Sequence, residues 1–102
     1  MRIDARLERP AGDDLRRHLR SPVHLGAGLR TPERPASPVT VTDLSTHGCG
    51  IEVSSHVSAG SRVWIKLPGL ESWDARVVWA QDGRAGLEFV RPLHPSVVAR
   101  YE

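Results

Sequence analysis

The chain of 102 residues contains a single cysteine, Cys49, so no intrachain disulfide can form. It has no apolar run approaching the roughly 20 residues that a membrane-spanning helix needs. Residues 1–17 are charged throughout and lack the apolar stretch of a secretory signal peptide. These absences predict a cytoplasmic protein without a membrane span.

Lysine is nearly absent as well, because thirteen of the fourteen basic residues are arginine. The planar fork of donors on arginine fits phosphate groups and guanine edges, which a lysine ammonium does not. This bias indicates a phosphate-bearing partner, although a GC-rich genome would favour arginine codons regardless of function. The aromatic residues are few, three Trp, one Tyr and one Phe, and most fall on apolar positions. Sheets that bind DNA or RNA use exposed aromatics for stacking, so this scarcity argues against a nucleic-acid polymer as partner.

No combination of residues typical of an active site is present. The five histidines are scattered, and no further cysteine completes a structural zinc site with His47 and Cys49. No Gly-rich phosphate loop precedes a helix, and no nucleophile, base and orienting group occur together. Cys49 falls on the inward phase of a predicted strand and is interpreted as a small core residue. The sequence therefore predicts a protein that is not an enzyme and holds neither a metal nor a cofactor.

Apolar and polar residues alternate with a period of two over most of the chain, and eight prolines and nine glycines punctuate this pattern. The pattern predicts six short strands, at 23–30, 39–42, 49–54, 62–67, 73–79 and 85–89. Asp82-Gly83 is typical of a type I′ hairpin turn, and the three prolines of residues 31–38 predict a loop. Six short strands leave two vulnerable edges unless the sheet closes into a barrel.

The predicted fold is thus all-β: a six-stranded antiparallel β-barrel with a flexible N-terminal arm and a short C-terminal helix. We expect the arm at residues 1–14, the β domain at 15–95 and the helix or tail at 96–102. The apolar residues at 97, 98 and 101 would rest on an open end of the barrel.

Two segments depart from the alternation, and such departures are where sequence can serve function rather than folding. The first is Arg16-Arg17-His18-Leu19-Arg20, whose three arginines repel one another unless an anion lies between them. Taken alone, such a run is more often a solvated basic face.

The second segment is Asp43-Leu44-Ser45-Thr46-His47-Gly48, which lies between two predicted strands. Gly48 permits a backbone conformation that is closed to other residues. Taken alone, such a segment is more often an ordinary hairpin in which the Asp and Ser side chains form hydrogen bonds with the turn backbone. Together, however, the two segments suit a ligand with several guanines and phosphates. A carboxylate accepts from the guanine ring N–H and amino group, and arginine forks take the phosphates and the O6/N7 edge.

In these segments the chain resembles the PilZ family of receptors for cyclic di-GMP, whose two signatures are RxxxR and [DN]xSxxG. Residues 16–20 and 43–48 match the two signatures in the right order, separated by one predicted strand and a loop. The segments 75–79 and 86–89 also look like the closing hairpin of the family. The resemblance covers about residues 14–95 and implies a barrel of PilZ type.

The resemblance implies roles for particular residues. Arg16 and Arg20 would grip phosphates and guanine edges, and Asp43 and Ser45 would hold a guanine, with Gly48 shaping the turn.

Two weaker candidates accompany them. Arg17 matches an extra arginine that is often found within the first motif. Trp79 would offer a flat face near the ligand, but its alternation with Val77 argues equally for a place in the core.

The predicted function is that of a stand-alone cyclic di-GMP receptor without an output domain. Binding would order the arginine segment against the barrel, and the change would signal to an unidentified effector protein. The alternative is a protein-interaction module of the same fold that does not bind nucleotide, although such members usually lack one or both motifs.

Overall fold

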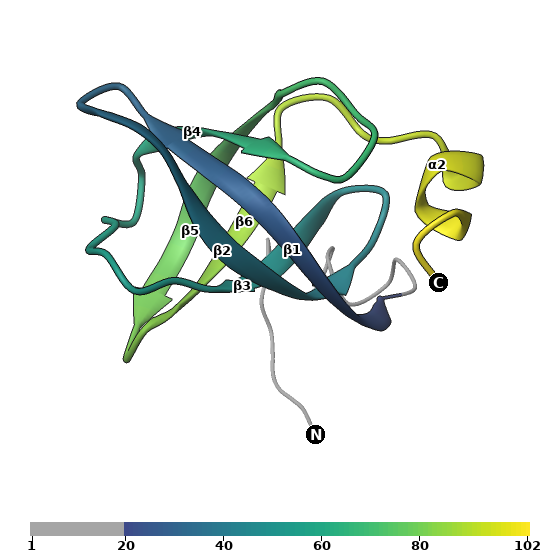
Figure 1. Ribbon diagram of the computed structural model, residues 1–102, viewed down its shortest axis with the longest axis horizontal. Helices are drawn as coiled ribbons and strands as arrows, with labels where there is room; N and C mark the ends of the chain where they lie inside the picture. Colours follow the sequence, from purple (N-terminus) through teal and green to yellow (C-terminus); the bar gives the residue numbers. More distant parts are fainter. Residues whose placement is uncertain (1–19) are drawn as a thin grey trace.

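The structure is a computed structural model in which residues 20–102 are described. Strands make up most of it, and a single short helix follows them (Figure 1). The strands are β1 (Ser21–Thr31), β2 (Arg34–Leu44), β3 (Gly48–Glu52), β4 (Arg62–Lys66), β5 (Trp73–Gln81) and β6 (Arg84–Phe89), and the helix is α2 (Pro95–Ala99). The predicted strands are all present.

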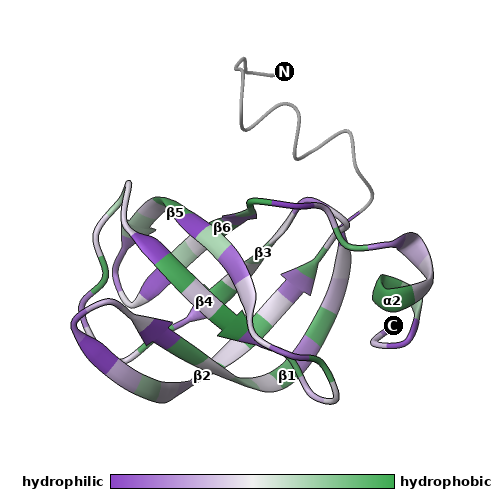
Figure 2. Cartoon of the chain, turned by 90° about the horizontal axis from the view of Figure 1, so that it is seen from above, coloured by the Kyte–Doolittle hydropathy of each residue, from purple (hydrophilic) through white to green (hydrophobic). Residues whose placement is uncertain are grey.

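The strands form one closed antiparallel barrel in the order β1-β2-β3-β6-β5-β4, with β4 pairing back onto β1. Closure gives every strand a neighbour on both sides, which is how small β proteins limit pairing with other chains. Colour alternates along the strands between hydrophilic and hydrophobic residues, as the period of two predicted (Figure 2). The predicted six-stranded antiparallel barrel is therefore confirmed.

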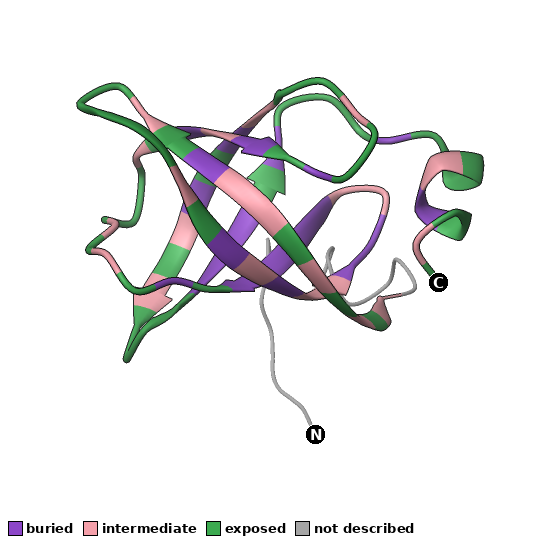
Figure 3. Cartoon of the chain, in the orientation of Figure 1, coloured by how far each residue is buried: buried purple, intermediate pink, exposed green. Residues whose placement is uncertain are grey.

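The core lies inside the barrel, where the inward-facing residues of all six strands meet (Figure 3). The largest fully buried side chains are mainly branched aliphatic residues: Leu44, Ile51, Ile65, Leu67, Leu87, Val41, Val63 and Val77. Such side chains suit a pleated, half-buried surface. Cys49 is also fully buried, in agreement with the prediction that it is a core residue.

The turns follow their local sequence in most places. Asp82 and Gly83 have φ values of 54° and 77°, which is the positive pair that a type I′ turn requires. The prediction of a loop at residues 31–38 is wrong, because β1 and β2 form a long hairpin that turns at residues 32–33. Pro35 and Pro38 are tolerated because this part of β2 pairs only with β1, while pairing with β3 begins at Thr40.

Helix α2 packs against one end of the barrel, as predicted (Figure 1). The His94 side chain caps it by accepting from the Ser96 N–H at 3.1 Å, and Pro95 occupies its first turn. Val98 is buried, and the Tyr101 hydroxyl donates to the Pro68 carbonyl over 2.5 Å. Among the residues described, no helix has the length and apolar character needed to cross a membrane.

Candidate functional site

The two sequence motifs meet at one side of the barrel. Arg20 lies immediately before β1, and the register pairs Pro22 of β1 with Asp43 of β2. Arg20 Nε donates to Asp43 Oδ1 over 2.9 Å, and Arg20 Nη2 lies 2.8 Å from the same oxygen. Both side chains remain about a third exposed, at 28% and 35%. The arginine motif and the aspartate motif are thus in direct contact through one residue of each.

The second carboxylate oxygen of Asp43, Oδ2, is engaged in weaker hydrogen bonding than Oδ1. Within the described residues its one hydrogen bond comes from the Thr42 hydroxyl, at a long 3.5 Å. A carboxylate has about four accepting positions, so Oδ2 retains capacity for further donors. Asp43 can therefore accept from a ligand while Arg20 still neutralises its other oxygen.

Ser45 occupies a different environment from Asp43, because it is fully buried. Its hydroxyl accepts from the backbone N–H groups of His47 and Gly48, each at 3.2 Å, and lies 3.4 Å from the Gly48 carbonyl. The Ser45 N–H also donates to that carbonyl over 2.9 Å. In this conformation Ser45 holds the turn together, and a direct bond to a guanine would require the turn to open. The predicted contact of Ser45 with a ligand therefore stays a prediction.

Gly48 is required for a reason other than the one predicted. It is absent from the residues with positive φ, so a special backbone conformation does not explain it. A Cβ at this position would lie 2.1 Å from the carbonyl oxygen of Leu87 on the paired strand β6. Close approach of two backbones therefore excludes a side chain here. Gly48 supports the site through the fold of the β2–β3 turn.

Cys49 follows Gly48 on β3 and faces the core. The pKa of its thiol is raised from 9.0 to about 12, mainly by burial and also by the Asp43 carboxylate, while Arg20 acts to lower it. The thiol is therefore protonated at neutral pH and is a poor nucleophile. Across residues 20–102 no cluster of three or more His, Cys, Asp or Glu side chains is arranged to hold a metal ion.

Trp79 lies on the outside of the barrel, so its interpretation as a core residue is wrong. A register shift between Val77 and Trp79 inserts Val78 as an extra residue and turns Trp79 outward. The side chain is 48% exposed. Its ring lies against Gly86, which is its cross-strand partner on β6.

Asp43 and Trp79 belong to one row of outward-facing residues that crosses four neighbouring strands. The registers pair Asp43 with Gly50, Gly50 with Gly86, and Gly86 with Trp79. The next row contains Thr40, Glu52 and Arg84, which are likewise paired in register. An open depression of about 900 Å³ is lined by this second row together with residues of β1 and of the β5–β6 turn.

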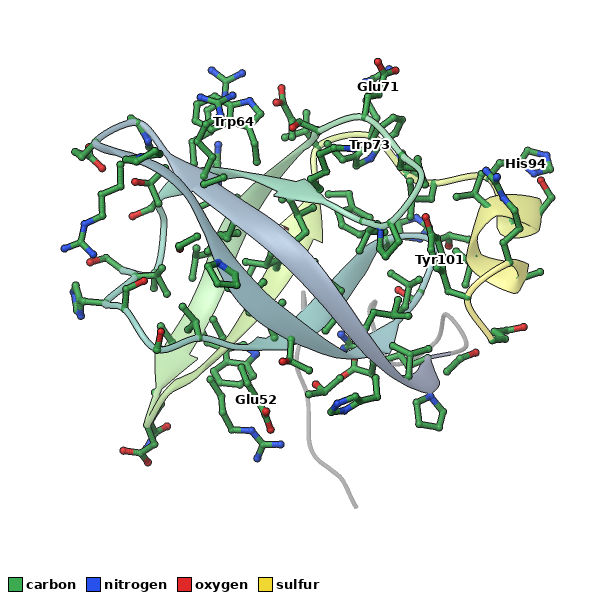
Figure 4. All side chains as sticks on the ribbon, viewed as in Figure 1. Glu52, Trp64, Glu71, Trp73, His94 and Tyr101 are labelled. Atoms are coloured by element: carbon green, nitrogen blue, oxygen red, sulfur yellow. The ribbon has the colours of Figure 1, made fainter. Side chains whose placement is uncertain are left out.

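A second exposed cluster, the Trp64 cluster, consists of Arg30, Arg62, Trp64 and Asp74 on β1, β4 and β5. The guanidinium carbons of Arg30 and Arg62 lie 4.0 and 4.8 Å from the centre of the Trp64 ring, and Arg62 pairs with Asp74 at 3.0 Å. Figure 4 shows Trp64 and Glu52 pointing out of opposite sides of the barrel. The Trp64 cluster therefore lies on the opposite side of the barrel from Glu52, which belongs to the row next to that of Asp43 and Trp79.

Arg16 and Arg17 lie outside the described residues, so their predicted contacts with a ligand stay predictions.

Sequence reasoning missed Gly50 and Gly86 as members of the candidate site. The signal for them was present, because a glycine on the outward phase of a strand often marks close approach by another group.

Comparison with known proteins identifies the family of the chain. The model of the PilZ domain family matches residues 14–100. The chain belongs to the PilZ family. PilZ domains are in general receptors for cyclic di-GMP and are binding modules rather than catalysts.

One similar solved structure is the PilZ domain of CeSA from a cellulose-synthesizing bacterium. It has a TM-score of 0.60 and 20% identity, over 71% of this chain and 80% of that one. At this identity the likeness supports the PilZ fold. None of the curated proteins compared with the chain matches it significantly.

Proposed function

We propose that this PilZ domain is a receptor for cyclic di-GMP that binds on the outer face of β2, β3, β6 and β5. The observation that carries the proposal is the contact between Arg20 of the first motif and Asp43 of the second. It places a guanidinium and a carboxylate with unused accepting capacity at one exposed position, where guanine and phosphate can be recognised together.

Each residue of the site has a distinct task in this proposal. Asp43 Oδ2 accepts from the N1–H and amino group of a guanine. Arg20, joined by Arg16 and in a lesser role Arg17, donates to the phosphates and to the O6/N7 edge. Trp79 supplies an exposed aromatic face at the other end of the row. Ser45 and Gly48 keep the turn that carries Asp43 in place.

Space for part of a dinucleotide lies beside the row, in a depression of about 900 Å³ that Thr40, Glu52 and Arg84 line and that Asp43 and Trp79 do not. By volume, the depression lies in the range typical of small-molecule sites. It is shallow and open, so a segment that closes over the ligand would add to the buried area. The arginine-rich residues that precede β1 are the part of the chain best placed in sequence to do so.

We expect cyclic di-GMP to bind far more tightly than cyclic di-AMP, GMP or GTP. Adenine presents an acceptor, and no amino donor, where guanine has N1–H and the amino group, so Asp43 would face an unmatched edge. Such a mismatch costs about 1–3 kcal/mol, or roughly five- to 150-fold in affinity. Isothermal titration calorimetry with each nucleotide measures this difference. Equal affinities for the two cyclic dinucleotides would refute the proposed role of Asp43.

The proposal includes a conformational response of the N-terminal segment up to Arg20, of which residues 1–19 lie outside those described. Positive charges at 16, 17 and 20 repel one another, and the phosphates of the ligand would neutralise this repulsion. Ordering a residue costs about 1–2 kcal/mol of backbone entropy, so the arm needs the anion to order. We expect amides 10–20 to exchange rapidly without cyclic di-GMP and to be protected with it. Protection already present without ligand would mean that the signal originates elsewhere.

The response is proposed to reach a separate effector protein. The alternative function, a PilZ module that binds proteins and no nucleotide, predicts no heat of binding in the same titrations. The nucleotide receptor is favoured because both motifs are intact in the sequence and Arg20 of the first contacts Asp43 of the second.

A further inference from the structure

Two paired glycines occupy the centre of the proposed site. Gly50 on β3 and Gly86 on β6 are cross-strand partners in the row between Asp43 and Trp79. Both are buried although they face outward, because a side chain from a neighbouring strand lies over each of them. That strand is β2 for Gly50 and β5 for Gly86.

Gly50 is covered by the carboxylate of Asp43. A Cβ built on Gly50 would lie 2.5 Å from Asp43 Oδ2 and 3.2 Å from the Thr42 hydroxyl oxygen. These atoms are ends of side chains, so the backbone could tolerate an alanine. The carboxylate, however, would have to leave its present position, and with it the oxygen that has capacity for a ligand.

Gly86 is covered in the same way by the indole of Trp79. A Cβ built on Gly86 would lie 2.2 Å from Trp79 Nε1 and within 3 Å of Cδ1 and Cε2. The Nε1 side of the ring therefore lies against the backbone of β6 at Gly86, and a side chain of any size at position 86 would displace the ring.

These contacts differ from those of other glycines in the barrel. A Cβ on Gly28 of β1 would meet its nearest neighbours at 3.9 Å, which is ordinary van der Waals contact. A Cβ on Gly48 would strike the backbone, which makes that glycine necessary for folding. Gly50 and Gly86 are distinct because the groups over them, Asp43 and Trp79, are the two side chains that the proposed function places against the ligand.

We propose that Gly50 and Gly86 are positioning residues that bring the Asp43 carboxylate and the Trp79 indole over two adjacent strands, so that one guanine contacts both. Strands lie about 4.8 Å apart, so β2 and β5 are separated by roughly 14 Å, which is longer than a guanine base. The two glycines let each side chain lean inward over its neighbouring strand. The edge of the base then meets Asp43 while its face meets Trp79. This inference rests on the proposed function of the site.

The test compares Gly50→Ala and Gly86→Ala with Gly28→Ala as the matched control. Affinities for cyclic di-GMP and cyclic di-AMP are measured for each variant by calorimetry or competition. Gly50→Ala is expected to lower the affinity for cyclic di-GMP about tenfold and to leave the affinity for cyclic di-AMP unchanged. The reason is that the displaced carboxylate forms hydrogen bonds with guanine only. Gly86→Ala is expected to lower the affinities for both nucleotides alike, because stacking on the face of an indole ring does not distinguish guanine from adenine. Gly28→Ala should bind as the wild type does.

A second comparison separates positioning from a general effect on folding. In a Trp79→Ala background the indole is absent, so Gly86→Ala should change neither affinity nor melting temperature further. If Gly86→Ala destabilises that background as much as the wild type, the clash is with the backbone and the inference is wrong.

The outcomes distinguish this inference from the proposed function. Absence of cyclic di-GMP binding by the wild-type chain refutes the proposed function itself. Wild-type binding that is unchanged in Gly50→Ala and Gly86→Ala refutes the role of the glycines and leaves the receptor function standing.

Discussion

Arg20→Ala is expected to lower the affinity for cyclic di-GMP by about ten- to a hundredfold and to leave the fold intact. A charge-assisted contact to a phosphate contributes roughly 1.5–3 kcal/mol, which corresponds to that loss. The ion pair with Asp43 is about a third exposed, and such pairs contribute at most about 1 kcal/mol to stability. Calorimetry and thermal unfolding of the same variant measure the two effects. Arg16→Ala should behave likewise, because it belongs to the same motif.

Arg34→Ala is the matched control for charge. Arg34 is exposed at the start of β2, nine positions before Asp43, which corresponds to about 30 Å along a strand. Its removal should leave the affinity unchanged. An equal loss in both variants would mean that net charge, rather than a specific contact, holds the nucleotide. A large loss of ligand-free stability in Arg20→Ala would mean that this arginine is structural.

Gly48→Ala is expected to destabilise the domain strongly, in contrast to the alanine variants of the site. Its Cβ would lie 2.1 Å from the Leu87 carbonyl oxygen, and neither strand can move without breaking the β3–β6 pairing. Overpacking of this kind costs about 1–3 kcal/mol or more. For a domain of this size the melting temperature should fall on the order of 10 °C.

The melting temperature followed by circular dichroism measures this effect, with Gly28→Ala as the control. Gly28→Ala meets only ordinary contacts and should melt within a few degrees of the wild type. Gly48→Ala melting at the wild-type temperature would contradict the assignment of Gly48 as a glycine of the fold.

The barrel was predictable because its signals are local. Alternating residues identified all six strands, and Asp82-Gly83 specified its turn through two positive φ values. The β1–β2 hairpin was missed because proline was judged without knowing which strands would pair. Pro38 is compatible with β2 only because β3 does not extend alongside it, and the sequence of β2 contains no information about that neighbour.

The site was predictable as a set of motifs but not as a geometry. The contact of Arg20 with Asp43 depends on the register of β1 against β2, which no motif encodes. The outward position of Trp79 depends on the bulge at Val78, which reverses the alternation for the rest of β5. The burial of Ser45 depends on how tightly the turn closes.

The central claim is that cyclic di-GMP binds on the face that carries Asp43, Gly50, Gly86 and Trp79. Its most direct test is a ¹H–¹⁵N correlation spectrum of the chain recorded during titration with this nucleotide. We expect the amides of Asp43, Gly50 and Gly86 and the indole N–H of Trp79 to shift saturably. Trp64 points out of the side of the barrel opposite Glu52, whose row borders this face. The resonance of the Trp64 indole N–H should therefore not shift. No saturable shift, or shifts centred on Trp64, would contradict the account.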